Sequence, residues 1–357
     1  MDNFKKLQNA LESRGLDAML LTSEQNCRYV SGFMASDMSC VVARDKAWYF
    51  TDSRYIEAAS AAITGAEIVV CGGDNPMGAA IKKALDDCGA ERVGAEETYL
   101  PHGSWLSYEK KLERELIPAQ DILTELRVIK EQEEVDSIIA AQRIAEEALA
   151  ETIKIIRPGM TEMQVAAELE YRMRCLGGEG VAFETIAVTG AKSSMPHGVP
   201  GEEVLKEGDF LTLDFGCIKN GYRSDMTRTF AIGYATEEME KVYNTVLAAQ
   251  LAGIELAKAG VLGSDVHNAG AKVIGDAGYG EYFGHGFGHS LGLEVHENPR
   301  FSPFWDKPIP AGAILTAEPG IYLPGRFGVR IEDMILITDD GYINLTKAPK
   351  ELTVIGK

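Results

Sequence analysis

Hydrophobic residues in the first 120 positions follow helical and strand spacings in turn. Phe4, Leu7 and Leu11 recur every three to four residues, which predicts a helix over residues 3–14. Apolar runs and further helical spacings predict strands at 17–22, 40–44, 47–52, 67–71 and 92–96 and helices at 56–62 and 77–88. Because strands and helices alternate, we expect one α/β domain over residues 1–124.

Beyond residue 124 the pattern changes to long helices followed by strands. Residues 131–156 are dense in Ala, Ile and Glu and predict one long helix. A Thr-x-x-Gln capping box at 161–164 predicts the start of a second helix that runs to about residue 176. An apolar strand at 183–189 and a loop that contains His197 follow. We therefore place a second domain at 125–357.

The first of two predicted hairpins brings two aspartates together. Asn220-Gly221 is a strong turn signal, because a type I′ turn needs positive φ at both central residues. With the turn there, Gly216 lies opposite Asp225, and Asp214 shares a face with Gly216. Asp214 and Asp225 become diagonal neighbours about 7–8 Å apart by Cα. Either this is a solvated outer face or a cation joins the two carboxylates.

A second predicted hairpin repeats the arrangement with two glutamates. Apolar strands at 313–322 and 328–337 flank a turn that we centre on Gly325. This register places Glu318 opposite Glu332. Two pairs of acids inside apolar strands favour a shared cation over chance.

Three of the six histidines fall in the Gly-rich stretch 285–300, which begins His285-Gly-Phe-Gly-His289 and continues to His296. Gly costs about 1 kcal/mol relative to Ala in a helix interior, so this stretch is expected to be extended or looped. Imidazole is the commonest metal ligand. Structural histidines in a Gly-rich loop are the alternative.

Four carboxylates and one imidazole would suit Mn²⁺, Mg²⁺ or Fe²⁺ better than a thiolate zinc site. Their four negative charges would balance two divalent ions, a known arrangement for activating a bridging hydroxide.

Charge and cysteine content narrow the class of protein. The formal net charge of −19 argues against nucleic-acid backbones and anionic membranes as partners. The six cysteines are scattered, without Cys-x-x-Cys spacing, and are expected to be reduced thiols. The N-terminus lacks an apolar targeting segment and no apolar run approaches 18 residues, so we expect a cytoplasmic protein.

Taken together, these motifs resemble the pita-bread metallopeptidases: Xaa-Pro dipeptidase (prolidase), aminopeptidase P, methionine aminopeptidase and the related creatinase. The resemblance covers nearly the whole chain and rests on Leu-Asp214-Phe-Gly, Ser-Asp225-Met-Thr-Arg-Thr, His285-Gly-Phe-Gly-His289, Glu318-Pro-Gly-Ile-Tyr and Val-Arg-Ile-Glu332-Asp, together with His296-Glu-Asn-Pro. It implies an α+β chain with a small creatinase-type α/β domain before a pita-bread catalytic domain.

The resemblance also implies roles for single residues. Asp214 would bind one metal ion and His289 the other, while Asp225 and Glu332 would bridge both. Glu318 would bind the His289 metal and shuttle protons.

Further roles follow for the pocket. His197 and His296 would stabilise the tetrahedral intermediate and hold the substrate, with His285 nearby. Arg300 stands where prolidase-like members carry an arginine for the substrate carboxylate; a surface arginine is the alternative.

The expected activity is hydrolysis of Xaa-Pro dipeptides by a metal-bridging hydroxide, with two divalent ions per subunit. Mn²⁺ is expected, and Co²⁺ or Zn²⁺ are alternatives. Other readings are an aminopeptidase for longer proline peptides, a hydrolase for non-peptide amides and a non-catalytic peptide-binding relative. A homodimer is also implied. Asp52 and Arg54 either pair with each other or reach toward the site of a partner subunit.

Overall fold

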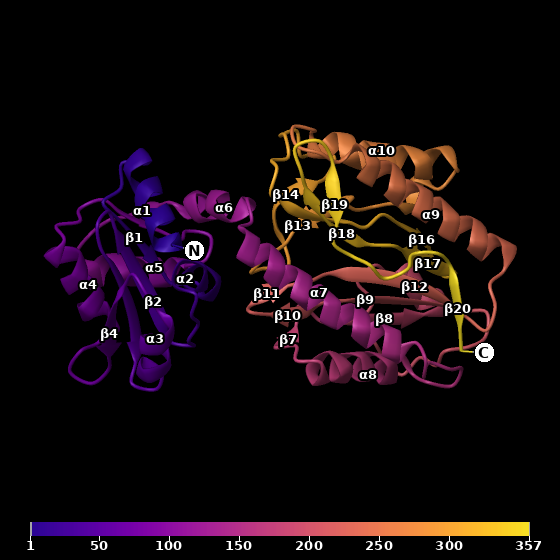
Figure 1. Cartoon of the computed structure of the whole chain (residues 1–357), viewed down its shortest axis with the longest axis horizontal. Coiled ribbons are helices and arrows are strands. Elements are labelled where there is room, and N and C mark those ends of the chain that lie inside the picture. Colours follow the sequence, from indigo (N-terminus) through magenta and orange to yellow (C-terminus); the bar gives the residue numbers. More distant parts are fainter. Residues whose placement is uncertain (1, 357) are drawn as a thin grey trace. The chain divides into compact units, whose positions relative to one another are not determined.

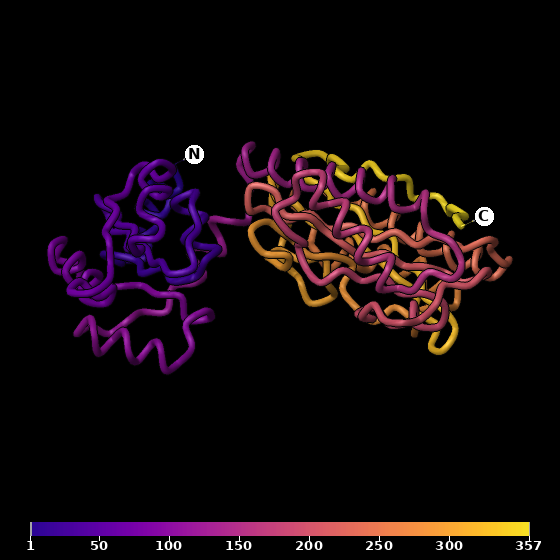
Figure 2. The backbone as a smooth tube through the Cα atoms, turned by 90° about the horizontal axis from the view of Figure 1, so that it is seen from below, coloured from indigo at the N-terminus to yellow at the C-terminus, as the bar shows by residue number. Residues whose placement is uncertain are grey.

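The protein is described by a computed structural model that covers residues 2–356. The chain forms two compact units, Met1–Arg127 and Val128–Lys357. The backbone passes from one unit to the other once, at the end of α6 (Gln120–Val128) (Figure 2). None of the helices within the described range has both the length and the apolar character that crossing a membrane requires.

The first unit is a mixed sheet covered by helices, as the alternating pattern predicted. Its strands pair in the order β4-β3-β2-β1-β5-β6. The strands are β1 (Ala18–Leu21), β2 (Met38–Ala43), β3 (Ala47–Asp52), β4 (Glu67–Cys71), β5 (Val93–Ala95) and β6 (Leu116–Pro118). The helices before α6 are α1 (Asn3–Ser13), α2 (Glu24–Ser31), α3 (Ile56–Ala62), α4 (Met77–Asp87) and α5 (His102–Leu112).

Three helices of this unit, α2, α5 and α6, were not predicted from the sequence. Helix α2 has only eight residues, and its start depends on the Ser23 hydroxyl, which accepts a hydrogen bond from the Asn26 amide. Helix α5 begins with Gly103 and Ser104 in its first turn, residues that weaken a helical pattern. The Arg54 guanidinium donates to Asp52 at 3.0 Å, so these two residues pair within the unit.

The second unit holds the predicted hairpins and four long helices. The helices are α7 (Gln132–Thr152), α8 (Glu162–Cys175), α9 (Glu237–Leu256) and α10 (Gly263–Asp276), with 3-10 turns η1 (Gly190–Ser194) and η2 (Gly280–Tyr282). Its first strands are β7 (Gly180–Val181), β8 (Ile186–Thr189), β9 (Phe210–Phe215), β10 (Cys217–Lys219), β11 (Tyr222–Arg223) and β12 (Met226–Ile232). The later strands are β13 (Gly288–Ser290), β14 (Glu297–Phe301), β15 (Ile314–Ala317), β16 (Gly320–Leu323), β17 (Phe327–Arg330), β18 (Asp333–Ile337), β19 (Tyr342–Asn344) and β20 (Thr353–Ile355).

Two of the predicted boundaries in this unit were wrong. Helix α7 ends at Thr152 rather than 156, because the chain turns through 153–155 before Pro158. Strand β8 begins at Ile186 rather than 183. The capping box of α8 is confirmed: the Gln164 amide N–H donates to Thr161 Oγ1, and the Gln164 side chain accepts from the Thr161 amide.

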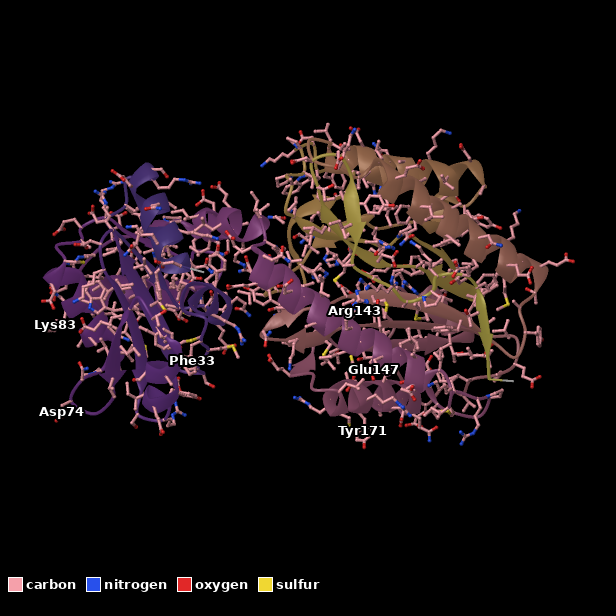
Figure 3. All side chains as sticks on the ribbon, viewed as in Figure 1. Phe33, Asp74, Lys83, Arg143, Glu147 and Tyr171 are labelled. Atoms are coloured by element: carbon pink, nitrogen blue, oxygen red, sulfur yellow. The ribbon has the colours of Figure 1, made fainter. Side chains whose placement is uncertain are left out.

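Helices cover the outer faces of the strands. Helices α7 and α8 pack beside β8 and β10, over the sheet β20-β12-β9-β8, and α9 and α10 pack beside β14–β17 (Figure 1). The apolar layer under α7 and α8 includes Leu169, Leu213 and Phe215, all fully buried. Tyr171, on the outer side of α8, is 65% exposed (Figure 3). On the opposite face of β9, Phe210 packs against Tyr243 of α9, and Asp214 lines a cavity.

Both hairpin registers agree with the predictions. Lys219 pairs with Tyr222 across the Asn220-Gly221 turn, and both turn residues have positive φ. The same register continues into β9 and β12, where Phe215 pairs with Met226. Gly320 pairs with Arg330, which centres the second turn on Gly325.

Candidate metal centre

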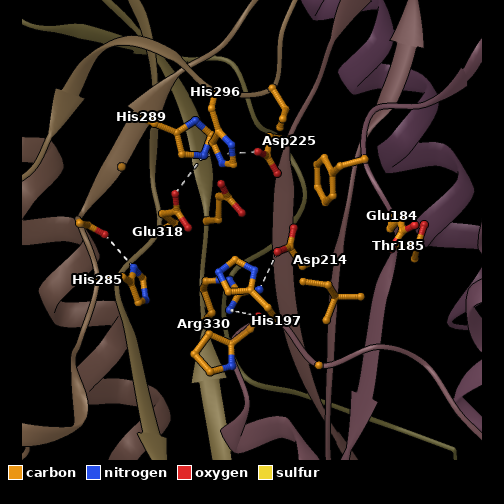
Figure 4. Close-up of a pocket in the computed structure, with 18 of the residues that line it drawn as sticks. Glu184, Thr185, His197, Asp214, Asp225, His285, His289, His296, Glu318 and Arg330 are labelled. Carbon is orange, nitrogen blue, oxygen red and sulfur yellow. Dashed lines mark hydrogen bonds and ion pairs between the residues drawn. The ribbon is translucent and has the colours of Figure 1, made fainter. Parts of the chain in front are cut away.

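Five predicted ligand residues come from separate strands and meet in one cavity of about 530 Å³ (Figure 4). Asp214 lies on β9 and Asp225 directly precedes β12. His289 lies on β13, which confirms the expected extended backbone. Glu318 follows β15 and Glu332 follows β17. All five side chains line the cavity.

Three of the five form a compact cluster. One possible ligand atom from each of Asp225, His289 and Glu332 lies within 4.8 Å of the other two. Glu318 lies beside them, with its Oε1 3.2 Å from His289 Nε2, and Asp225 Oδ2 is 3.7 Å from the same nitrogen. Carboxylate oxygens of Asp225 and Glu318 therefore lie near Nε2 of His289, and Glu332 belongs to the same cluster.

Asp214 is turned toward an arginine instead of toward this cluster. The Arg330 guanidinium donates to Asp214 Oδ2 at 2.6 Å. The other oxygen, Oδ1, is buried and has no hydrogen-bond partner among the described residues, and the same holds for Asp225 Oδ1. Two aspartates thus present unsatisfied oxygens inside one cavity, an arrangement that requires a cation or an ordered partner.

Crowding of the acids shifts their proton affinities. Burial, and then the charges of neighbouring carboxylates, raise the pKa of Asp225 well above its usual range. Burial and the charge of Glu318 do the same to the pKa of Glu332. Like charges in a buried site disfavour ionisation, and bound cations would reverse this effect.

Glu318 behaves differently because it touches the imidazole. Burial alone would raise its pKa, but the hydrogen bond and charge of His289 lower the pKa of Glu318 to about 2. Thr316 Oγ1 donates to Glu318 at 3.0 Å and accepts from the His289 amide, also at 3.0 Å. One hydroxyl therefore aligns both residues.

The donor set fits divalent metal ions. It offers carboxylate oxygens and one imidazole, the combination that Mn²⁺ and related ions accept. Gly216 keeps the strands close, since a Cβ there would lie 1.9 Å from the Ser224 carbonyl oxygen. Only a glycine permits the approach that places Asp225 beside the cluster.

The other predicted site residues line the same cavity. His296 packs edge-on against His289 with ring centroids 4.4 Å apart. Burial, then the charges of His289 and Arg300, lower the pKa of His296 to about 4. Arg300 pairs with His289 across β13 and β14. His197 is exposed on the loop after η1.

His285 lines the cavity beside the predicted ligands. Its Nε2 is 3.0 Å from the Tyr322 hydroxyl, which accepts a hydrogen bond from Arg330 at 2.8 Å. Burial lowers the pKa of His285. Hydrogen bonds through Tyr322 and Arg330 therefore connect the His285 imidazole to Asp214.

Sequence reasoning missed Arg330, Thr227 and Tyr322. Thr227 Oγ1 donates to Glu332 Oε2 at 2.6 Å and accepts from Arg330 Nε at 3.0 Å. Strand parity offered a signal, because Arg330 lies two residues before Glu332 and therefore shares its face. A charged residue in the apolar run Val-Arg-Ile pointed to the same interior.

Comparisons with known proteins agree along the whole chain. The profile of "Metallopeptidase family M24" matches residues 136–339, and that of "Creatinase/Prolidase N-terminal domain" matches residues 4–129. A Pyrococcus horikoshii protein named Xaa-Pro dipeptidase is 34% identical over 98% of both chains. The structure of an Xaa-Pro dipeptidase from Bacillus anthracis is 38% identical with a TM-score of 0.96, covering 99% of each chain. That of an X-Pro aminopeptidase from Thermotoga maritima is 36% identical with a TM-score of 0.91, covering 97% of this chain and 100% of that one.

Proposed function

The chain belongs to metallopeptidase family M24, with a creatinase-type domain before a pita-bread catalytic domain, and from this membership we propose that it is an Xaa-Pro dipeptidase. The family implies divalent metal ions. We propose two per subunit, Mn²⁺ first and Co²⁺ or Zn²⁺ as alternatives. The observation that carries the dipeptide assignment is Arg300, which pairs with His289 on the neighbouring strand, lines the cavity and has no hydrogen bond or ion pair among the described residues.

In this proposal the five clustered residues divide the two metal ions. Asp214 would hold one ion and His289 with Glu318 the other, and Asp225 and Glu332 would contribute to both. The unpartnered oxygens of Asp214 and Asp225 support this division, because each is a free ligand atom inside the cavity.

When bound, the two ions would polarise the scissile carbonyl and lower the pKa of a water toward neutrality. Glu318 takes a proton from the attacking water and passes it to the leaving nitrogen. That transfer is needed because proline leaves as an amine from a tertiary amide. The low pKa of Glu318 keeps this side chain ionised as a carboxylate near neutral pH.

The histidines act on the substrate oxygen and on orientation. His296, with a pKa of about 4, is neutral near pH 7 and donates a hydrogen bond to the developing oxyanion. His197 lines the cavity from the exposed loop after η1 and helps to hold the substrate. His285 orients Tyr322, to which it is hydrogen-bonded.

Arg300 decides the length of the substrate. A guanidinium binds a carboxylate through two parallel hydrogen bonds, and only a dipeptide carries its carboxylate on the proline itself. An aminopeptidase for longer peptides is the second candidate, because the Thermotoga maritima structure named X-Pro aminopeptidase has the same fold.

A cleavage panel tests the proposal. The protein is loaded with Mn²⁺, Co²⁺ or Zn²⁺ and given Ala-Pro, Ala-Pro-Ala or creatine. We expect Ala-Pro to be cleaved fastest, and Arg300→Ala to reduce kcat/KM for Ala-Pro far more than for Ala-Pro-Ala. Arg326→Ala, a change at an arginine that does not line the cavity, is the control. Equal losses on both peptides would reject the dipeptidase assignment, and no cleavage of either would reject the peptidase. Light scattering tests the proposed homodimer.

A further inference from the structure

The cavity holds two charged side chains that the metal centre does not use. Four acids are proposed metal ligands, and Arg330 is bonded to one of them, Asp214. The remaining two are Glu184 and Arg300, and no hydrogen bond or ion pair joins either to another described residue. Arg300 was assigned above to the substrate carboxylate. The Glu184 carboxylate therefore remains without an assigned binding partner.

Glu184 is presented by a break in the strand register. Val181 pairs with Cys217, and Ile186 pairs with Asp214. Val181 and Ile186 are five residues apart in the sequence, but their partners are only three residues apart. The two extra residues bulge out of the ladder between β7 and β8. Bulges next to active sites commonly re-aim side chains, and residues 183–185 all line the cavity.

A second observation concerns the neighbouring residue, Thr185. Thr185 is only 4% exposed, yet its Oγ1 is buried and has no hydrogen-bond partner among the described residues. Buried hydroxyls are nearly always satisfied, so this one points to a missing partner. In the view of Figure 4, Glu184 and Thr185 lie beyond Asp214, on the side away from His289 and Glu318.

The two free charges stand on opposite walls, which fixes the direction of a dipeptide. Arg300 belongs to the wall of His289, and Ile186, two residues from Glu184, pairs with Asp214 on the other wall. With the proline carboxylate at Arg300 and the scissile carbonyl at the cluster, the preceding residue points toward the bulge. Its side chain, rather than its backbone, meets Glu184.

The distance to Glu184 determines whether the substrate's side chain or its α-ammonium group can reach it. Glu184 lies two residues along the chain from Ile186, a span of at most about 7 Å. An α-ammonium lies two bonds from the scissile carbon and stays beside the cluster, whereas the ammonium of a lysine lies six bonds away. Phe183 and Ile186 line the cavity next to Glu184 and offer apolar surface for a methylene stem.

We propose that Glu184 is a specificity-determining residue that favours substrates with Lys or Arg before the proline. This rests on the proposed dipeptidase function.

The test compares Lys-Pro with norleucine-Pro, which has the same carbon stem without the charge. Because Glu184 is exposed, we expect kcat/KM to be about three- to fivefold higher for Lys-Pro at neutral pH. Glu184→Gln should bring this ratio close to one. Glu184→Lys should bring it below one. Glu202→Gln, an exposed glutamate outside the cavity, should keep the wild-type ratio.

The outcomes separate the two proposals. Hydrolysis of both dipeptides with a wild-type ratio near one overturns the role of Glu184 and leaves the dipeptidase intact. A wild-type preference that persists in Glu184→Gln also overturns it, since another group then reads the charge. If neither these dipeptides nor Ala-Pro are hydrolysed, both proposals fail together.

Discussion

Replacing Thr227 by valine tests one hydroxyl that connects Glu332, a proposed metal ligand, to Arg330. Thr227 is fully buried on β12. Its Oγ1 donates to Glu332 Oε2 at 2.6 Å and accepts from Arg330 Nε at 3.0 Å, while Arg330 also holds Asp214. Valine has nearly the same shape and no polar atom, so Thr227→Val removes these bonds without opening a cavity.

The expected losses follow from the two groups left behind. A buried polar group without its partner costs about 1–3 kcal/mol, and the change orphans the Arg330 Nε–H and weakens the support of Glu332. The hydroxyl also sets the orientation of the Glu332 carboxylate. Loss of such an orienting bond lowers metal affinity by about 10- to 100-fold.

Thr229→Val is the matched control, because Thr229 is also a buried threonine on β12 with polar partners. Its Oγ1 lies 3.1 Å from Thr212 Oγ1 and donates to the Arg330 carbonyl, and it touches no proposed ligand. Urea unfolding in the presence of a chelator measures stability, and Mn²⁺ titration measures affinity. Both variants should lose stability, but only Thr227→Val should lose metal affinity. Equal Mn²⁺ affinity in the two variants would refute the orienting role.

Three further predictions concern the cluster and its surroundings. Asp225→Ala should abolish activity and reduce bound metal from two ions toward one or none; full activity with two ions would contradict its bridging role. Burial and neighbouring acids raise the pKa values of Asp225 and Glu332. At pH values between their ordinary pKa near 4 and the raised pKa, the metal-free folded protein therefore binds more protons than the unfolded chain. Acidification through that window should stabilise the metal-free protein, and Mn²⁺ uptake should release protons, seen as a buffer-dependent heat of binding that is absent if the reasoning fails. Lys130→Met removes a cation 3.0 Å from Glu297, in a pair with side chains 1% and 7% exposed, and should cost about 3 kcal/mol in urea unfolding. The exposed Lys206→Met should cost little, and equal effects would contradict the prediction.

Turn chemistry made the ligand hairpins predictable from the sequence. The Asn220-Gly221 turn fixes the register of its strands, so Asp214 and Asp225 had to share a face. The register centred on Gly325 did the same for Glu318 and Glu332. Local backbone rules were sufficient here because a hairpin is closed by neighbours in sequence.

Contacts between distant segments could not be predicted in the same way. The bulge at 183–185 arises from two different registers against one partner, and neither register is visible in the strand itself. The expected strand start at 183 was wrong for this reason. Arg330 looked like an ordinary strand residue, because its partners Asp214 and Tyr322 belong to other strands.

Arg228 on β12 connects the two hairpins through its buried guanidinium. Its five N–H groups have five acceptors: the carbonyl oxygens of Thr227, Glu332, Ala348 and Pro349 and the Asp333 carboxylate. A buried guanidinium with every donor satisfied tolerates little displacement of its partners, since any shift would orphan a charged donor. The backbone of Glu332 is therefore fixed relative to β12, whichever side chains line the cavity. The cavity can accordingly vary at positions such as Glu184 without disturbing the positions of the acids proposed as metal ligands.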